Sequence, residues 1–450
     1  MNHIYTILIL IAGLFFFFIQ NLPAQQLPEK STQEVVDGIS TATTKSATAK
    51  EEKTSRLQFG GYGEIVMTRN FFSDNINRYT HAGNYKNASG HGRFDIPHVT
   101  FLVRYEFGSG WRMNAEVEFE HGGAEAAMEL EAEEAGEYET EIERGGEIAL
   151  EQIWIEKTFS NALNLRLGHN IVPVGLTNQY HLPTEFFTVY RPQGESSIMP
   201  CTWHETGITL WGLLGDWRYE VMLMPGLDSE MFNRQNWIQG GSASPYEFKV
   251  ANKYAGALRI DNYSIKGLRI AISGYYGHSF NNSIQPSIAD KYKNVKGAVM
   301  IGSVDFAYKD HNWIARGYFD YGHLGDSDII STYNKSLPKL SPSPRSNVAS
   351  DALCAGVEAG YDIFSQITKL QNQQLYVFGR YEYYDSMYKT TDNILDNEWC
   401  GRQIIVGGVN YFPVKDLVIK AEYSAGLLKS YYNNENSISI GVAYSGIFTR

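Results

Sequence analysis

The chain has 450 residues and a formal net charge of −12, and 43% of its residues are hydrophobic. This acidic balance argues against nucleic acid as a partner. The mean hydropathy is −0.30, and no run of about 18 apolar residues follows the N-terminus, which excludes a helical membrane protein. Tyr (30), Phe (23) and Gly (42) are abundant, a composition that favours β-structure.

The N-terminus has the pattern of an export signal. Residues 7–19 form an apolar run that is too short to cross a bilayer comfortably, and Asn21-Leu22-Pro23-Ala24 follows it. We predict a signal peptide over residues 1–24, with a membrane anchor as the alternative. Residues 25–56 are rich in Ser, Thr, Ala, Glu and Lys, so we expect a disordered periplasmic lead-in there.

From residue 57 onward, short runs alternate apolar and polar residues, as in Trp111-Arg112-Met113-Asn114-Ala115-Glu116-Val117-Glu118-Phe119-Glu120. Side chains flip faces at each residue of a strand, so such a run has one apolar face and one polar face. We predict sixteen strands, which begin near Leu57, Arg93, Trp111, Glu147, Leu163, Glu205, Trp217, Tyr254, Leu268, Gly297, Trp313, Ala352, Leu375, Arg402, Leu417 and Ser437. The expected fold is all-β: a transmembrane antiparallel β-barrel over residues 57–450.

The gaps between these runs are alternately short and long. Gly108-Ser109-Gly110 is one of the short gaps, and residues 71–92 form one of the long ones. Short periplasmic turns and long extracellular loops are typical of barrels in the bacterial outer membrane. A soluble β-sandwich is the alternative, but it gives no reason for every long gap to fall at an alternate junction.

With the apolar face turned to lipid, the inner face of most strands is charged, and a water-filled lumen can hold such charges whereas a dry one cannot. The pore-lining residues that we predict are Arg104, Arg112, Glu116, Glu118, Glu120, Arg166, Arg218, Arg259, Arg269, Arg316, Arg380 and Lys420. An arginine stripe could guide anions, or each arginine could pair with an acid, as Arg218 with Glu220. The strand from 147 to 159 is an exception, because Glu156 or Lys157 must face outward.

Two of the long gaps stand out. The gap 171–204 is the longest and least polar, with four prolines, and long loops of this kind are usually functional. We predict that it folds into the lumen as a constriction lined by Glu185, Arg191 and Glu195; packing at a contact between protomers is the alternative. Residues 122–147 hold ten Glu and one Arg, so this loop would attract cations if it lies at the mouth, or else it is simply a solvated surface.

Several stretches resemble the phosphate-selective porin O and P family in its Bacteroidetes form. They are Glu106-Phe107-Gly108-Ser109-Gly110-Trp111, residues 115–123, residues 168–178, and the segment from Arg191-Pro192-Gln193-Gly194-Glu195-Ser196 to Thr202-Trp203-His204-Glu205-Thr206-Gly207. The resemblance implies a sixteen-stranded outer-membrane porin, usually a homotrimer, that passes small solutes and often prefers anions. The acidic loop and the lack of a terminal aromatic residue depart from the family pattern.

We therefore expect a porin for passive diffusion of small hydrophilic solutes, with anions such as phosphate among them, and with outer-membrane lipid around it. A barrel that transports or binds one specific ligand is the alternative. His204-Glu205 lacks the second His of a zinc-protease motif, so no enzyme, cofactor or metal is expected. For Cys201, Cys354 and Cys400, one Cys354–Cys400 bridge and three free thiols both remain open.

Overall fold

The computed structural model describes residues 56–121, 127–132, 138–143, 147–242, 249–339, 341–370 and 372–449. The predicted signal peptide and almost all of the predicted lead-in lie outside these residues. For the acidic segment 122–147, the structure describes only parts of the backbone.

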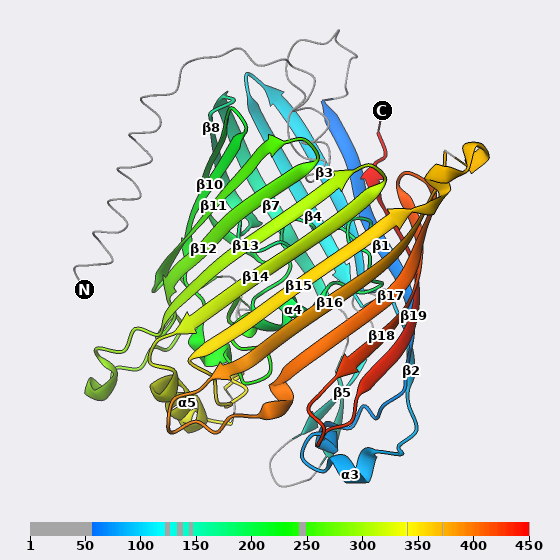
Figure 1. The fold of residues 1–450 in the computed structure, drawn as a ribbon. Helices are drawn as coiled ribbons and strands as arrows, with labels where there is room; N and C mark the ends of the chain where they lie inside the picture. The colour runs from blue at the N-terminus through cyan, green and yellow to red at the C-terminus, as the bar shows by residue number, and fades with distance from the viewer. Residues whose placement is uncertain are drawn as a thin grey trace.

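The strands form one closed antiparallel barrel (Figure 1). Its strands are β1 (Leu57–Asn70), β2 (Gly92–Asp95), β3 (His98–Gly108), β4 (Trp111–Glu120), β7 (Glu147–Ser160), β8 (Leu163–Ile171), β9 (His204–Leu214), β10 (Trp217–Pro225), β11 (Tyr254–Ile265), β12 (Leu268–His278), β13 (Ala298–Asp310), β14 (Trp313–Leu324), β15 (Asp351–Asp362), β16 (Gln374–Lys389), β17 (Gly401–Val414), β18 (Leu417–Leu427) and β19 (Glu435–Ile447). Apart from β2 and β3, which both pair with β1, each strand pairs with the next strand of the wall along the chain, and β1 pairs with β19 to close the wall.

The seventeen strands of this sheet make a sixteen-stranded wall, because β2 and β3 both pair with β1 and together form one interrupted strand. Pro97 lies in the interruption, where its missing N–H would break the hydrogen-bond ladder. The prediction of a sixteen-stranded antiparallel barrel is confirmed. The predicted strand starts agree with the structure to within two residues, the largest difference being Ser437 against Glu435.

The remaining elements lie in the connections. A separate hairpin, β5 (Ala127–Ala132) with β6 (Tyr138–Glu143), occupies the acidic segment, where the sequence pattern predicted no strands. The helices are η1 (Ile76–Arg78), α3 (Ala82–Tyr85), α4 (Gln193–Ile198), η3 (Ser229–Met231), η4 (Gln239–Ser242), η5 (Asp290–Tyr292), α5 (Ser327–Ser336), η6 (Ile363–Gln366), η7 (Thr368–Leu370) and η8 (Glu398–Cys400). Among the described residues, none of these helices has the length and apolar character needed to cross a membrane.

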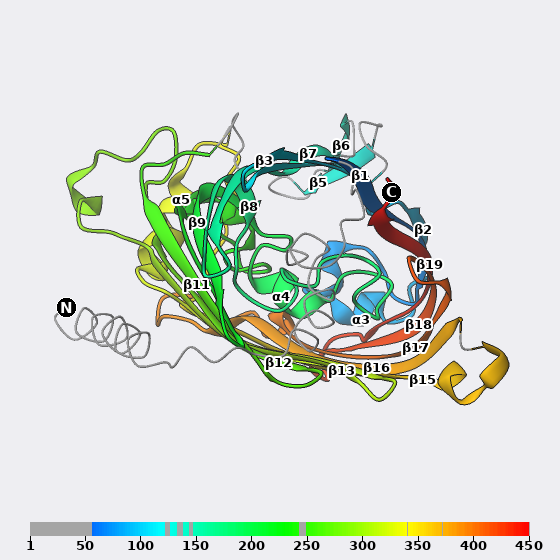
Figure 2. The ribbon, with the colours of Figure 1, turned by 90° about the horizontal axis from the view of Figure 1, so that it is seen from above.

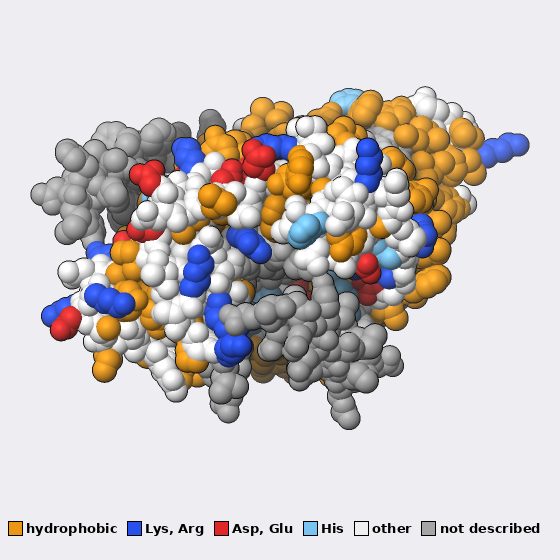
Figure 3. Space-filling model, turned by 90° about the horizontal axis from the view of Figure 1, so that it is seen from below, with side chains coloured by type: hydrophobic (Ala, Val, Ile, Leu, Met, Phe, Trp, Pro, Cys, Tyr) orange, Lys and Arg blue, Asp and Glu red, His pale blue; other side chains and the backbone are white. Residues whose placement is uncertain are grey.

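Connection length separates the two ends of the barrel. The short turns lie at the end where the C-terminus emerges, and the long loops with α3 and α5 lie at the opposite end (Figure 1). The view onto the long-loop end shows charged side chains of both signs across that face and apolar side chains gathered along part of its margin (Figure 3). This layout agrees with the alternation of short and long gaps in the sequence.

The outward face of the wall is apolar and the inward face is polar. Ile65 of β1 is 62% exposed and Val221 of β10 is 44% exposed, whereas the neighbouring Glu64 and Glu220 are buried inside. A closed sheet with an apolar outer band satisfies every backbone group within lipid. The protein is therefore a transmembrane barrel of the bacterial outer membrane.

A β-bulge in β7 explains the strand that broke the alternation. Glu116 of β4 pairs with Gln152, but the next residue of β4, Val117, pairs with Leu150, so Glu151 is the extra residue. Glu151 and Gln152 are both buried, and the alternation resumes after them in the opposite phase. Glu156 therefore faces inward, and Lys157 faces outward near the short turns. Its ammonium lies 5.4 Å from the centre of the Trp111 ring.

Part of the polypeptide lies inside the barrel and fills some of its interior. Residues 171–204, with α4, run inside the wall (Figure 2). A buried apolar cluster lies between the inner wall and the long loops, and it includes Trp203, Phe232, Trp237 and Phe280. Trp237 packs directly on the inner face of β14 at Gly322, where a side chain would collide with the indole ring.

Candidate functional site

Arginine and carboxylate side chains from neighbouring strands pair on the inner wall. Arg112 of β4 and Arg166 of β8 flank Glu156 of β7, with nitrogen–oxygen distances of 2.9 Å and 2.8 Å. Arg166 also lies 3.8 Å from Glu220 of β10. The cross-strand register brings these groups together, because Glu156 pairs with Arg112 on one side and with Arg166 on the other.

The network continues through β10, β11, β12 and β13. Arg218 lies 3.3 Å from Asp261. Asp261 in turn binds Arg259 at 2.9 Å and Arg269 at 3.0 Å. Both of these arginines also contact Asp305, at 3.0 Å and 2.5 Å. The Arg259 side chain is 0% exposed, so this part of the network is buried and supports the wall.

A second network joins β14, β15 and β16. Glu358 accepts hydrogen bonds from Arg316 and from Arg380, each at 2.7 Å, and Arg380 also binds Glu382 at 2.7 Å. Of the arginines in the two networks, Arg166, Arg218 and Arg316 keep the most contact with solvent, with side chains 13%, 16% and 10% exposed. In both networks, these arginines therefore pair with acidic side chains, which is one of the two roles that the sequence left open for them.

The remaining predicted inner-face residues of the first strands lie in an acidic corner. Glu116 accepts hydrogen bonds from Asn114 and Gln152, and Glu118 accepts one from Tyr62. Arg104 lies nearby, 3.3 Å from the Asn114 side chain. Glu120 ends β4 opposite His98. Carboxylates therefore outnumber arginines on this side of the lumen.

Several inward-facing side chains form hydrogen bonds with the backbone of the 171–204 segment. The ammonium of Lys420 donates to the carbonyl oxygens of Phe186 and Thr188, at 2.9 Å and 2.8 Å. Asn410 donates to the carbonyl of Phe187 at 3.0 Å. On the opposite wall, Arg259 donates to the carbonyl of Gly175 at 3.1 Å. Lys420 thus holds the loop and does not project freely into solvent.

Other contacts accept hydrogen bonds from the same segment or pack against it. The Glu382 carboxylate accepts from the amide of Gly194 at 3.1 Å, at the start of α4. The Glu422 carboxylate accepts from the amide of Val189 at 2.8 Å. Phe187 stacks on Phe378 of β16 with ring centres 5.1 Å apart. These contacts fix the path of the loop across the lumen.

The three residues expected at the constriction lie in different surroundings. Burial raises the pKa of Glu185 to about 7, although the positive charge of Arg316 opposes this shift. For Arg191, burial lowers the pKa, but Tyr62 and Glu118 outweigh that effect and raise it. The loop therefore places Glu185 near the basic part of the wall and Arg191 near the acidic corner.

Glu195 has a different environment from the one expected at a constriction. Its carboxylate accepts hydrogen bonds from the backbone amides of Leu176 and Thr177, both at 2.6 Å, and from the Thr177 hydroxyl. The residue is 0% exposed, and burial raises its pKa. Glu195 therefore ties α4 to the start of the loop and is not exposed to passing solutes.

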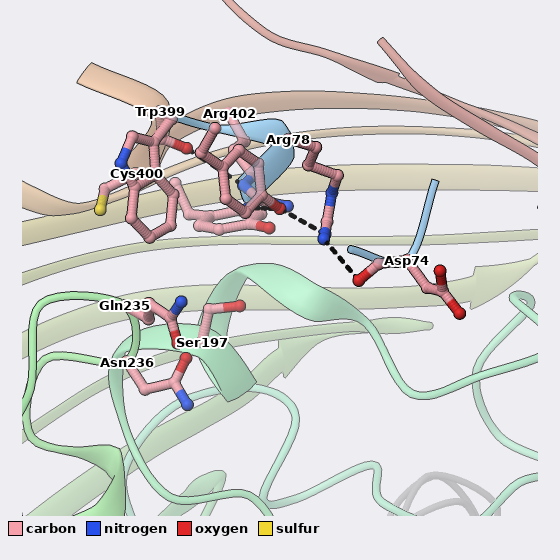
Figure 4. Close-up of a pocket in the computed structure, with 10 residues that line it drawn as sticks. Asp74, Arg78, Ser197, Gln235, Asn236, Trp399, Cys400 and Arg402 are labelled. Carbon is pink, nitrogen blue, oxygen red and sulfur yellow. Dashed lines mark hydrogen bonds between the residues drawn. The ribbon is translucent and has the colours of Figure 1, made fainter. Parts of the chain in front are cut away.

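A cavity of about 400 Å³ lies between α4 and the long loops (Figure 4). Tyr79 stacks on Trp399 with ring centres 4.4 Å apart. Arg78 and Arg402 both donate to the Tyr79 hydroxyl at 2.6 Å, and both pair with Glu435. The rest of the lining is Asp74, Ser197, Gln235, Asn236, Tyr384 and Cys400.

The sequence pattern did not indicate this cavity between α4 and the long loops, which we call the vestibule. Its lining comes from three long loops, from α4 and from the ends of two strands, and no local motif marks the residues that meet there.

Of the two states that the sequence left open for the cysteines, the structure has three free thiols. No disulfide bridge joins Cys354 to Cys400.

Comparisons with known proteins give a limited result. No known family profile matches the chain. An uncharacterized protein of Aquifex aeolicus (strain VF5) is 25% identical over 383 residues, which cover 82% of this chain and 75% of that protein. The resemblance to the phosphate-selective porin O and P family therefore stays a prediction.

Similar solved structures include an anion-selective porin from Comamonas acidovorans (9% identity, TM-score 0.47, 87% of this chain and 99% of that chain). Another is the outer-membrane channel DcaP of Acinetobacter baumannii (12% identity, TM-score 0.47, 88% and 99%). Likenesses this distant carry no argument about solute or selectivity. The function proposed below therefore rests on the side chains of this barrel.

Proposed function

We propose that the protein is a porin-type channel for passive diffusion of small hydrophilic solutes across the outer membrane. The observation that carries this proposal is the charged inner wall of a closed barrel. Charged groups are costly in a dry interior even when they are paired, and a sixteen-stranded barrel is wide enough to hold water. The partly exposed Arg166, Arg218 and Arg316 are the wall cations that solutes would meet.

Residues 171–204 would set the size of the passage. The segment crosses the lumen and is held on both sides, by Arg259 and by Lys420. Glu185 and Arg191 are its charged residues that are not fully buried, so we propose that these two residues line the constriction.

We further propose a weak preference for anions such as phosphate along the arginine side of the wall. The network from β4 to β13 joins five arginines to four carboxylates: Arg112, Arg166, Arg218, Arg259 and Arg269 with Glu156, Glu220, Asp261 and Asp305. Because most of these charges cancel, the remaining field is small, and selectivity should be modest.

Planar-bilayer recording of the purified protein tests both the channel and its preference for anions. We expect stepwise ohmic conductance, and in a KCl gradient a reversal potential whose sign shows that chloride passes more easily than potassium. Heat-denatured protein in the same detergent is the control. Absence of conductance would reject the channel, whereas a reversal potential of the opposite sign would reject only the anion preference.

A second candidate is a channel specific for one ligand, and the vestibule favours it. Stacked aromatic faces beside paired arginines suit a hydroxylated or carboxylated organic solute. Such a solute should block the current in a saturable way, and Trp399→Ala should remove the block and leave open-channel conductance unchanged. A block that is equal in both proteins would exclude the vestibule as the binding site.

The homotrimer implied by the family resemblance also stays a proposal. Sedimentation equilibrium in a density-matched detergent gives the protein mass of the particle. Three chains per particle would support it, and one chain would contradict it.

A further inference from the structure

We propose that His98, Glu118 and Glu120 form a binding site for a divalent transition-metal ion on the inner wall, near the long-loop end of the barrel. His98 and Glu120 are direct partners in the β3–β4 register, and Glu118 pairs with Thr100 on the same face. One donor atom from each residue lies within 4.8 Å of the other two. Small side-chain rotations would bring all three to about 2 Å from a common ion.

A neighbouring carboxylate orients the imidazole of His98. Its Nδ1 lies 2.7 Å from Oε1 of Glu64 on β1, and Glu64 is itself buried. Metal-bound histidines almost always donate their other ring nitrogen to a carboxylate or a carbonyl group, which fixes the tautomer and raises the basicity of the ligand. With Nδ1 protonated and directed to Glu64, Nε2 carries the lone pair that a metal requires.

Carboxylates outnumber cations around the triad, where Arg191 of the 171–204 segment is the cation that interacts with Glu118 and Glu151. Glu151 is fully buried, and its Oε1 has no hydrogen-bond partner among the described residues, although Nε2 of His181 lies 3.9 Å from it. The Tyr62 hydroxyl lies 2.8 Å from Glu151 and 3.1 Å from Glu118, so it connects this carboxylate to the triad. A buried carboxylate is costly when one of its oxygens accepts no hydrogen bond. A divalent ion beside Glu118 would lower that cost.

The donor set selects the class of metal. One imidazole and two carboxylates suit Zn²⁺, Mn²⁺ or Fe²⁺, whereas Ca²⁺ and Mg²⁺ prefer oxygen donors alone. Three protein ligands leave at least one position for water or for an anion. The His98 side chain is 15% exposed, so an ion in the lumen could reach the site.

Calorimetric titration of Zn²⁺ into untagged, chelator-treated full-length protein in detergent tests the site. We expect one ion per chain. His98→Gln and Glu120→Gln should each weaken binding at least about tenfold, and Glu64→Gln about 10- to 100-fold. His323→Gln is the matched control, because His323 pairs with Asp351 at 3.0 Å elsewhere on the wall. His204→Gln is a second control, since it removes one imidazole of the His169–His204 pair, which lies on β8 and β9.

Absence of Zn²⁺ binding by the unmodified protein would overturn the proposal, as would binding that His98→Gln leaves unchanged. Equal affinity for Ca²⁺ would overturn the assigned class of metal. If the variants fail to fold, X-ray absorption at the zinc edge of the unmodified protein decides the question. One imidazole with oxygen donors supports the site, and a spectrum without imidazole rejects it.

Discussion

Lys420 of β18 donates a hydrogen bond to the carbonyl oxygen of Phe186, 2.9 Å away in space and 234 residues earlier in the chain. The same ammonium also binds the carbonyl of Thr188. A single wall cation thus holds the middle of the lumen-crossing segment, in a position where neither carbonyl has ready access to water.

Replacing Lys420 with Met should release that part of the loop. Each buried carbonyl left without a donor costs about 1–3 kcal/mol, so the loop should leave its docked position for part of the time. We expect larger and noisier single-channel currents, with frequent transitions between levels. Lys415→Met, in the turn after β17, is the control and should behave as the unmodified protein.

Shortening the lumen-crossing segment tests it as the constriction. Replacing residues 179–191 with a short Gly–Ser linker keeps the Glu195 contacts to Leu176 and Thr177 and should raise single-channel conductance. A deletion of similar size around the fully exposed Ile288 is the control. Unchanged conductance in the first variant would contradict a filtering role.

Glu185 should make ion selectivity depend on pH. Its pKa is about 7 because of burial, so the carboxyl is protonated below that pH and negatively charged above it. Lowering the pH from about 8 to about 6 should therefore raise the chloride-to-potassium permeability ratio, measured from reversal potentials. Glu185→Gln should fix the ratio near its low-pH value. An equal pH response in this variant would show that another group titrates.

Arg259 should be essential for the stability of the wall. Arg259→Met leaves Asp261 and Asp305 with one partner fewer in a fully buried place, and breaking such a pair costs about 3–5 kcal/mol. Urea unfolding in lipid vesicles should show this loss as a lower midpoint. Lys335→Met, on the exposed part of α5, should leave the midpoint unchanged.

The sequence predicted the arrangement of the wall well and the contents of the lumen poorly. Period-two alternation placed the inward Arg218 and Glu220 correctly, because a strand side chain has only two faces to choose from. The sequence showed that the strand from 147 to 159 breaks the alternation, but it did not show that Glu151 is the inserted residue, because this depends on the register with the partner strand. The position of Glu195 was also not predicted from the sequence. Its charge suggested contact with solutes, but its carboxylate is buried and holds the loop.

What the sequence alone determined is the barrel: the strands, their lipid-facing and lumen-facing sides, and the separation of short turns from long loops. These follow from local rules of periodicity and connection length. The tertiary structure alone decided which charges pair, where residues 171–204 cross the lumen, and that His98 meets Glu64, Glu118 and Glu120. Such contacts depend on strand register and on the path of the loops, which local sequence does not specify.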